Sequence, residues 1–136
     1  MNEYRLINFK IFGDERGFLT PIENGIDIPF EIKRIFYIYG TKGPNIVRGQ
    51  HANRKTKFVL MMPAGSCKIK IYNNEGSVQE IVELNTPNQG LYLDNMIFKE
   101  MYDFTDNAVM IAISSEHFDE FEYIDTYEDF LKEIKK

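Results

Sequence analysis

Ser66-Cys67-Lys68-Ile69-Lys70-Ile71-Tyr72-Asn73-Asn74-Glu75-Gly76, followed by the run from Val78 to Leu84, is the stretch that decides the fold class. Apolar and polar residues alternate from Ser66 to Tyr72, which is the period of a strand with one buried face. Asn73-Asn74-Glu75-Gly76 has the composition of a hairpin turn, and the next run can supply the returning strand. The sequence therefore predicts an antiparallel hairpin here.

Strand-type segments separated by turn residues continue in both directions from this hairpin. We expect strands over residues 4–9, 17–22, 32–39, 46–51, 57–62, 66–72, 78–84, 90–93, 96–104 and 108–114. The first two flank the turn Gly13-Asp14-Glu15-Arg16, and no helical segment crosses between the strands. About ten short strands without crossover helices favour an all-β, double-sheet jelly roll over a parallel sheet.

The one helical pattern lies at the end of the chain. Asp125-Thr126-Tyr127-Glu128 offers a capping box, and Tyr127, Phe130, Leu131 and Ile134 recur at helical spacing. We expect a short amphipathic C-terminal helix that packs against the barrel.

Length and composition indicate a single domain over residues 1–136. Hydrophobic residues make up 43% of the 136 residues and aromatic residues 14%, which is enough for a core. The net charge of −5 argues against binding to a nucleic-acid backbone, because that affinity depends on many Lys and Arg contacts. The start of the chain has no signal-peptide pattern and no run is long enough to cross a bilayer, so we expect a cytoplasmic protein without a membrane partner. Cys67, the single cysteine, is interpreted as a small buried residue.

The segment Arg48-Gly49-Gln50-His51-Ala52-Asn53 gathers an arginine, a histidine and an amide beside strand-type runs, as at the mouth of a β-barrel. His51 is the candidate for proton transfer, since a neutral imidazole both accepts and returns a proton near pH 7. Its alternative role is that of a structural imidazole. Arg48 suits a phosphate or a sugar oxygen, and its alternative is a surface ion pair.

Lys99 stands in an alternating run in which Ile97, Lys99 and Met101 share one face of a strand. If that face lines the barrel interior, Lys99 directs a cation at the ligand; otherwise it is a solvated edge residue. Tyr102 falls on the other face, and a tyrosine in a β-protein is more often a core residue whose hydroxyl reaches the edge.

A metal site is not expected. A metal-binding site of this fold needs several histidines and a carboxylate that converge on one ion, whereas this chain has two histidines, His51 and His117. His117 lies in an acidic stretch that we place near the surface.

Several spaced blocks occur in an order that is characteristic of one family. They are Ile7-Asn8-Phe9-Lys10, Asp14-Glu15-Arg16-Gly17, Ile32-Lys33-Arg34-Ile35-Phe36-Tyr37, Arg48-Gly49-Gln50-His51-Ala52, Gly65-Ser66-Cys67, Gly90-Leu91-Tyr92 and Glu100-Met101-Tyr102-Asp103-Phe104. In these blocks the chain resembles, over residues 6–130, the sugar 3,4-ketoisomerases, cupins that act on dTDP-4-keto-6-deoxy-D-glucose.

The resemblance implies a cupin jelly roll, a homodimer that often shares N-terminal strands, and catalysis without a metal or cofactor. It implies isomerisation of a dTDP-linked keto sugar to its 3-keto isomer through an enediolate, a step toward 3-amino sugars of lipopolysaccharide or S-layer glycans. In this reading His51 is the base, Lys99 stabilises the enediolate, and Tyr37 matches a family tyrosine. Arg16, Arg48, Asn53 and Tyr102 are the expected substrate-binding residues.

The chain departs from the family pattern at three positions. Many members carry a second histidine where this chain has Asn53, and some carry histidines where it has Lys99 and Tyr102. Asn53 cannot exchange a proton, although it can hydrogen-bond a sugar oxygen. Two alternatives therefore stay open: a dTDP-sugar 3,5-epimerase with Tyr102 as the acid, and a non-catalytic nucleotide-sugar binding protein.

Overall fold

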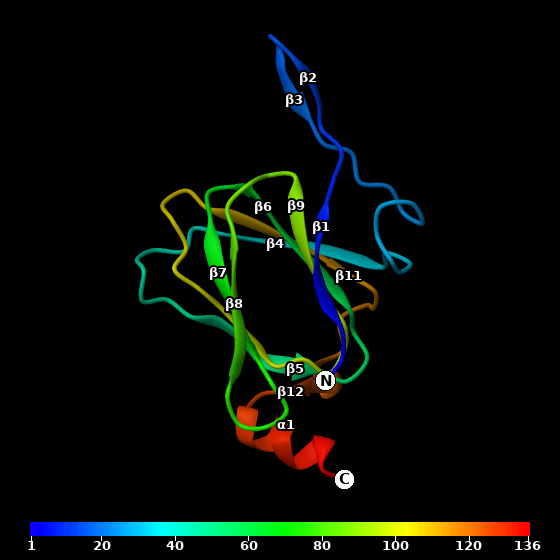
Figure 1. Cartoon of the computed structure of the whole chain (residues 1–136), viewed down its shortest axis with the longest axis vertical. Coiled ribbons are helices and arrows are strands. Elements are labelled where there is room, and N and C mark those ends of the chain that lie inside the picture. Colours follow the sequence, from blue (N-terminus) through cyan, green and yellow to red (C-terminus); the bar gives the residue numbers. More distant parts are fainter.

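The computed structural model describes all 136 residues, and ten of its strands form two antiparallel sheets of five strands each. The first sheet has the strand order β1 (Tyr4–Asn8), β9 (Gln89–Leu93), β6 (Phe58–Ala64), β11 (Val109–Ser114) and β4 (Arg34–Tyr39). The second has the order β12 (Tyr123–Ile124), β5 (Arg48–Asn53), β10 (Lys99–Tyr102), β7 (Cys67–Tyr72) and β8 (Val78–Leu84). The two sheets form the jelly roll predicted from the sequence (Figure 1).

The hairpin that decided the fold class is confirmed. Strands β7 and β8 pair antiparallel, from Cys67 opposite Leu84 to Ile71 opposite Glu80. Cys67, Ile69 and Ile71 are buried, whereas the lysines between them are half-exposed, as the alternation of the sequence requires.

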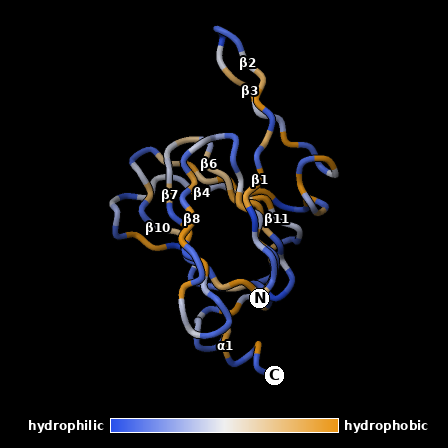
Figure 2. Tube along the Cα trace, viewed as in Figure 1, coloured by the Kyte–Doolittle hydropathy of each residue, from blue (hydrophilic) through white to orange (hydrophobic).

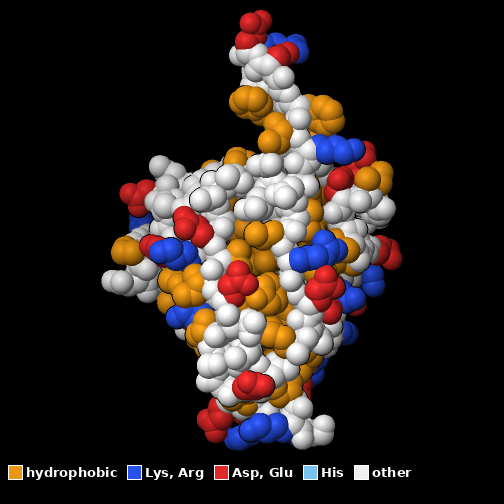
Figure 3. All heavy atoms as spheres, in the orientation of Figure 1, with side chains coloured by type: hydrophobic (Ala, Val, Ile, Leu, Met, Phe, Trp, Pro, Cys, Tyr) orange, Lys and Arg blue, Asp and Glu red, His pale blue; other side chains and the backbone are white.

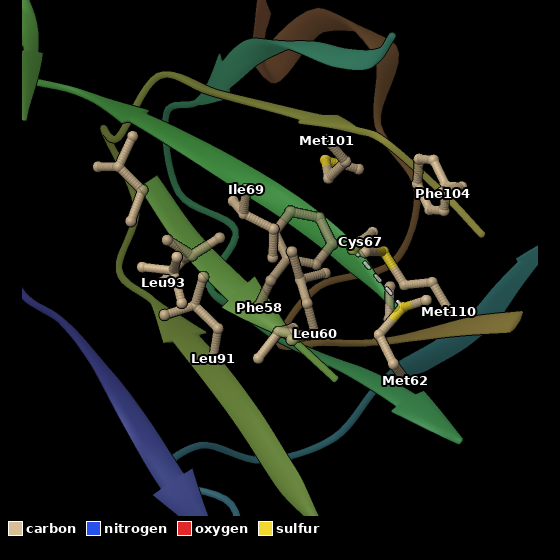
Figure 4. Close-up of a cluster of buried hydrophobic side chains, with 14 of the residues drawn as sticks. Phe58, Leu60, Met62, Cys67, Ile69, Leu91, Leu93, Met101, Phe104 and Met110 are labelled. Carbon is tan, nitrogen blue, oxygen red and sulfur yellow. Dashed lines mark hydrogen bonds between the residues drawn. The ribbon is translucent and has the colours of Figure 1, made fainter. Parts of the chain in front are cut away.

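The main core fills the space between the two sheets. It contains Phe58, Leu60 and Met62 from β6, and the inward residues of β7 and β9 pack against them (Figure 4). Cys67 belongs to this core, where its thiol lies 3.6 Å from the sulfur of Met62, and burial raises the pKa of that thiol to about 12. The cysteine is therefore an inert packing residue, as expected from the sequence.

The predicted strand over residues 17–22 is shorter and differently placed than expected. Strands β2 (Phe12–Asp14) and β3 (Gly17–Leu19) form a separate hairpin that projects from the body of the molecule (Figure 1). Within one chain, the apolar face of this hairpin has no second sheet to pack against. Its apolar side chains consequently stand in solvent, with acidic and basic groups at the tip (Figure 3). The trace is coloured hydrophobic along part of this hairpin and hydrophilic at its tip (Figure 2).

Among the other strands that differ from their predicted bounds, two lie at the site. The strand predicted over residues 46–51 is β5, which begins later, at Arg48, and ends at Asn53. The strand predicted over residues 96–104 shrinks to β10, because Met96 and Asp103 on its two sides have positive φ angles of 56° and 55°. Left-handed backbone interrupts pairing, and a propensity pattern does not reveal it.

The C-terminal helix is confirmed as α1 (Tyr127–Ile134), preceded by a 3₁₀ turn (Glu120–Glu122). Thr126 caps the helix, since its hydroxyl accepts a hydrogen bond of 3.1 Å from the amide of Asp129. Phe130 is fully buried against Phe98 and Ala52, so α1 closes the end of the second sheet next to β5 and β12. The helix is much too short to span a membrane, and no other helix is a candidate for doing so.

Candidate active site

A cavity of about 420 Å³ opens between the two sheets. Tyr37, Arg48, His51 and Lys99 all line it, so the structure brings four of the candidate residues together. Its apolar wall comes from core residues, namely Phe58, Leu60, Met101 and Met110, which Figure 4 shows on facing strands. Charged groups on an apolar floor suit a ligand with a polar head and a ring.

A bulge in β5 directs both Arg48 and His51 into this cavity. Lys99 of β10 is opposite His51 and Glu100 is opposite Gly49, so Gln50 is an extra residue in the ladder. Gly49 and Gln50 have φ angles of 81° and 57°. Without this bulge, strand alternation would put residues 48 and 51 on opposite faces.

Glycine is required at position 49. A Cβ atom there would lie 2.9 Å from the sulfur of Met101 and 3.2 Å from the carbonyl oxygen of Lys99, in addition to its left-handed φ. A glycine within a strand pattern is a sequence signal for such a bulge, although the strand predicted over residues 46–51 was regular.

His51 has the geometry of a base. Its Nδ1 lies 3.0 Å from the carbonyl oxygen of Gly49, and because a carbonyl only accepts, Nδ1 carries the proton and Nε2 keeps its lone pair. Burial lowers the pKa of His51 to about 4, and the charge of Lys99 adds to this effect. The hydrogen bond to the Gly49 carbonyl acts in the opposite direction and is the smallest of the three effects on this pKa. The ring packs edge-on to Tyr123 at 4.8 Å between centroids. The imidazole is therefore neutral and fixed in orientation at physiological pH.

Lys99 lies on the interior face of β10, the first of the two placements considered for it. The residue is only 4% exposed, and its Nζ donates a 3.1 Å hydrogen bond to Oδ1 of Asn53. The ammonium group also lies 5.0 Å from the centroid of the Phe58 ring. Burial lowers the pKa of Lys99 to about 7, against a raising effect of Glu122. Near neutral pH this lysine can therefore both carry charge and exchange a proton.

Arg48 and Tyr37 lie at the exposed rim of the cavity. None of the chain's ion pairs involves Arg48, so its guanidinium is free for an external anion. Tyr37 is 63% exposed and its ring lies 5.6 Å from that of Tyr39 on the same strand. Both residues can reach a ligand that enters from solvent.

The remaining three candidates do not line the cavity. Asn53 is buried behind Lys99, and its amide is occupied within the chain. Tyr102 lies on the other face of β10, with the ammonium group of Lys70 at 5.1 Å from its ring. Arg16 sits on the projecting hairpin, in an ion pair of 2.7 Å with Asp14.

Three residues of the site were not singled out from the sequence. Arg34 and Tyr123 line the cavity, and Glu122 is a buried carboxylate behind it. Glu122 and Tyr123 come from the acidic stretch after β11, which reads as a solvated loop because charge dominates its composition. Only the pairing of β12 with β5, with Tyr123 opposite Asn53, places them at the site.

The side chains that converge here are cations, an imidazole and phenols. No group of three or more His, Cys, Asp or Glu side chains is arranged to hold a metal ion. The arrangement can bind an anionic, oxygen-rich ligand, remove a proton at His51 Nε2 and stabilise negative charge at Lys99.

Comparison with known proteins identifies chains of the same kind. The family described as "FdtA: WxcM-like, C-terminal" matches residues 2–135. The TDP-4-oxo-6-deoxy-alpha-D-glucose-3,4-oxoisomerase of Aneurinibacillus thermoaerophilus is 40% identical over 134 residues, which cover 98% of this chain and 94% of the relative.

Solved structures agree in fold and sequence. The sugar 3,4-ketoisomerase QdtA from Thermoanaerobacterium thermosaccharolyticum, in complex with TDP, has a TM-score of 0.91 and 42% identity, covering 97% of this chain and 94% of QdtA. A histidine-to-asparagine mutant of QdtA in complex with TDP-4-keto-6-deoxyglucose has a TM-score of 0.92 and 40% identity, covering 99% and 96%. A dTDP-4-dehydrorhamnose 3,5-epimerase from Bacillus anthracis has a TM-score of 0.75 at 15% identity, over 89% of this chain and 77% of the epimerase, which is a likeness of fold alone.

Proposed function

Because the chain belongs to the FdtA, WxcM-like C-terminal family, we propose that it is an isomerase, a 3,4-ketoisomerase that converts dTDP-4-keto-6-deoxy-D-glucose into a dTDP-3-keto-6-deoxyhexose. The relatives that match it over nearly their whole length are named for this reaction, and QdtA has been solved with TDP and with the keto sugar. The epimerase alternative has only the distant fold likeness in its favour.

The observation that carries the mechanism is that His51 and Lys99 are opposite each other on paired strands and line one cavity. In the proposed reaction, Nε2 of His51 removes the proton from C3 of the sugar, and the electron pair moves to the C4 carbonyl to give an enediolate. The Lys99 ammonium group stabilises the negative oxygen. The ketone shift is completed when a proton is delivered to C4 and the hydroxyl proton on the C3 oxygen is transferred to the C4 oxygen.

Arg48 and Tyr37 are proposed to hold the substrate at the rim. The free guanidinium of Arg48 suits the diphosphate, whose paired oxygens match its planar donors. Tyr37 lines the same cavity from β4 of the other sheet, and its hydroxyl can hydrogen-bond the sugar. We assign Asn53 to support of Lys99 rather than to direct substrate contact, because its amide is already occupied.

The test is incubation of the purified protein with dTDP-4-keto-6-deoxy-D-glucose in deuterated water, followed by NMR, with a 3-aminotransferase to trap the product. A 3-keto product with deuterium introduced at C4 is expected. Exchange at C3 and C5 without ketone migration would instead identify an epimerase. Binding without exchange would identify a non-catalytic nucleotide-sugar protein. The face on which deuterium enters at C4 gives the configuration of the product.

We also propose that the functional unit is a homodimer in which each copy's β2–β3 hairpin packs on the other. Phe12, Phe18 and Leu19 on this hairpin are exposed, as are Ile35 and Tyr39 on the unpaired edge strand β4. Exposed apolar side chains on a projecting hairpin and a free sheet edge both favour association. In such a dimer Arg16 lies at the partner's surface, which gives it a route to a substrate there.

The remaining proposals concern where the protein acts in the cell and which pathway uses its product. A free buried thiol, Cys67, and a nucleotide-linked substrate agree with a cytoplasmic enzyme. The 3-keto group of the product is the substrate class of an aminotransferase, so we propose a role in the synthesis of 3-amino sugars for surface glycans.

A further inference from the structure

The buried carboxylate of Glu122 has no part in the reaction as described so far. It is 5% exposed, and it accepts four hydrogen bonds: from the amides of Lys55 and Thr56 at 3.0 Å each, from the Thr56 hydroxyl, and from Nδ2 of Asn53 at 3.2 Å. Burial of a carboxylate is costly unless its oxygens are satisfied in this way. A glutamate buried behind the cavity, with both oxygens hydrogen-bonded, is more than a surface charge.

Glu122 fixes the direction of the Asn53 side chain. An amide donates through nitrogen and accepts through oxygen, and a carboxylate can only accept. Nδ2 of Asn53 therefore faces Glu122, which leaves Oδ1 to face the ammonium group of Lys99 at 3.1 Å. The three side chains form one ordered row, carboxylate to amide to ammonium, that ends inside the cavity.

We propose that Glu122 is a positioning residue of this site, which acts through the Asn53 amide to hold the Lys99 ammonium group in place and in its charged form. This deepens the proposed function and rests on it for the catalytic consequence alone. The row explains how the chain manages with an asparagine at position 53: the side chain links a buried anion to a buried cation instead of exchanging protons.

The electrostatics agree with this row. Burial lowers the pKa of Lys99 to about 7, and Glu122 is the group that opposes this effect. Other titratable groups face the same cavity from the elements packed around Lys99. They are His51 and Arg48 on β5, Tyr123 on β12, and Arg34, Tyr37 and Tyr39 on β4. Glu122 is thus the one carboxylate that offsets the cations at this end of the cavity.

The test is a pH titration of the Lys99 Nζ resonance by NMR with ¹⁵N-labelled lysine, in the wild type and in Glu122→Gln. Loss of the negative charge should lower the titration midpoint by about one unit. The alkaline limb of the kcat/KM profile, which reports the free enzyme, should move to lower pH by the same amount, while KM at a fixed pH below that limb changes little. A merely structural role would lower stability without moving either midpoint.

The matched control is Glu133→Gln, which removes a carboxylate from the same corner, where it pairs with Arg54 at 2.9 Å away from the cavity. Both midpoints should stay at their wild-type values. An unchanged midpoint in Glu122→Gln, or an equal shift in the control, would overturn the proposal. The NMR titration needs no substrate, so it tests the role of Glu122 independently of the proposed reaction. The proposed reaction is tested separately, by turnover of the wild type.

If Glu122→Gln does not fold, a second variant tests the same row of hydrogen-bonded side chains. Asn53→Leu keeps the carboxylate but removes the link, so the Lys99 midpoint should again fall relative to the wild type. A midpoint that stays near 7 would mean that Lys99 keeps its charge without the row, and the proposal fails.

Discussion

At the scale of the residue, the two central groups of the site are driven away from their ordinary protonation by the same cause. Burial disfavours charge on both, so the pKa of His51 falls to about 4 and that of Lys99 to about 7. The histidine is then neutral over the whole physiological pH range, as a base must be. The pKa of the lysine lies close to physiological pH. Groups with separated pKa values at one site can take opposite roles in proton transfer.

The first prediction concerns His51→Asn. Removal of the base should lower kcat by about 10²–10⁴-fold, the usual contribution of general base catalysis, and should leave TDP binding within a few-fold of the wild type. The NMR assay above gives the rate, and calorimetric titration with TDP gives the binding. An unchanged rate would rule out His51 as the base.

The pH dependence follows from the same residue. Because the pKa of His51 in the free protein is about 4, the acid limb of kcat/KM should lie near pH 4 rather than near 6.5. Measurement of kcat/KM from about pH 3 to 7 checks this, and a limb near 6.5 would mean that the imidazole is solvated in the free enzyme.

At the scale of the element, the β2–β3 hairpin is the part of the chain that most lacks a partner. Phe18 is 83% exposed, which is costly for so large an apolar side chain. We predict that Phe18→Ser raises the dimer dissociation constant by at least about 10-fold, since burial of a phenylalanine contributes about 1.5–3 kcal/mol. Sedimentation at several concentrations measures it.

The control is Ile26→Ser, which replaces another exposed apolar residue of the segment after the hairpin. This variant should leave the dissociation constant unchanged. A wild type that sediments as a monomer at micromolar concentration would refute the dimer itself.

The C-terminal helix α1 is an element that depends on one anchor. Phe130 is fully buried in a cluster with Phe98, Ala52 and Ile124. Phe130→Ala should lower the free energy of unfolding by about 3–5 kcal/mol, because the cavity left behind adds to the lost transfer energy. Lys132→Ala on the exposed face should change it by less than about 0.5 kcal/mol. Urea denaturation measures both, and equal effects would mean that α1 is not packed as described.

At the scale of the whole molecule, the site lowers the stability of the fold. Between pH 7 and about 10 the unfolded chain binds a proton at Lys99 that the folded chain does not, so this residue makes stability rise with pH over that window. We predict that Lys99→Met is more stable than the wild type by about 1–4 kcal/mol at pH 6, and that the difference narrows toward pH 10.

Lys70→Met is the matched control for this prediction, since Lys70 is half-exposed on the outer face of β7. Its stability difference from the wild type should not depend on pH over the same window. Denaturation at pH 6, 8 and 9.5 distinguishes the two, and a constant difference for Lys99→Met would show that Lys99 is not desolvated in the fold.

The sequence by itself determined the fold class, most strand positions, the terminal helix and the likeness to ketoisomerases. Those properties depend on local periodicity and on short ordered blocks, both of which are written along the chain: alternation sets a strand with one buried face, and the spacing of Tyr127, Phe130, Leu131 and Ile134 sets a helical stripe.

Only the tertiary structure decided which residues meet at the site. The bulge at Gly49 and Gln50 turns Arg48 toward the same cavity as His51, the pairing of β12 with β5 brings Glu122 to Asn53, and the free hairpin carries Arg16 away from the body. Each depends on backbone angles or on pairing between distant segments. Such features arise when non-local contacts are satisfied together, and the local pattern of side chains does not contain them.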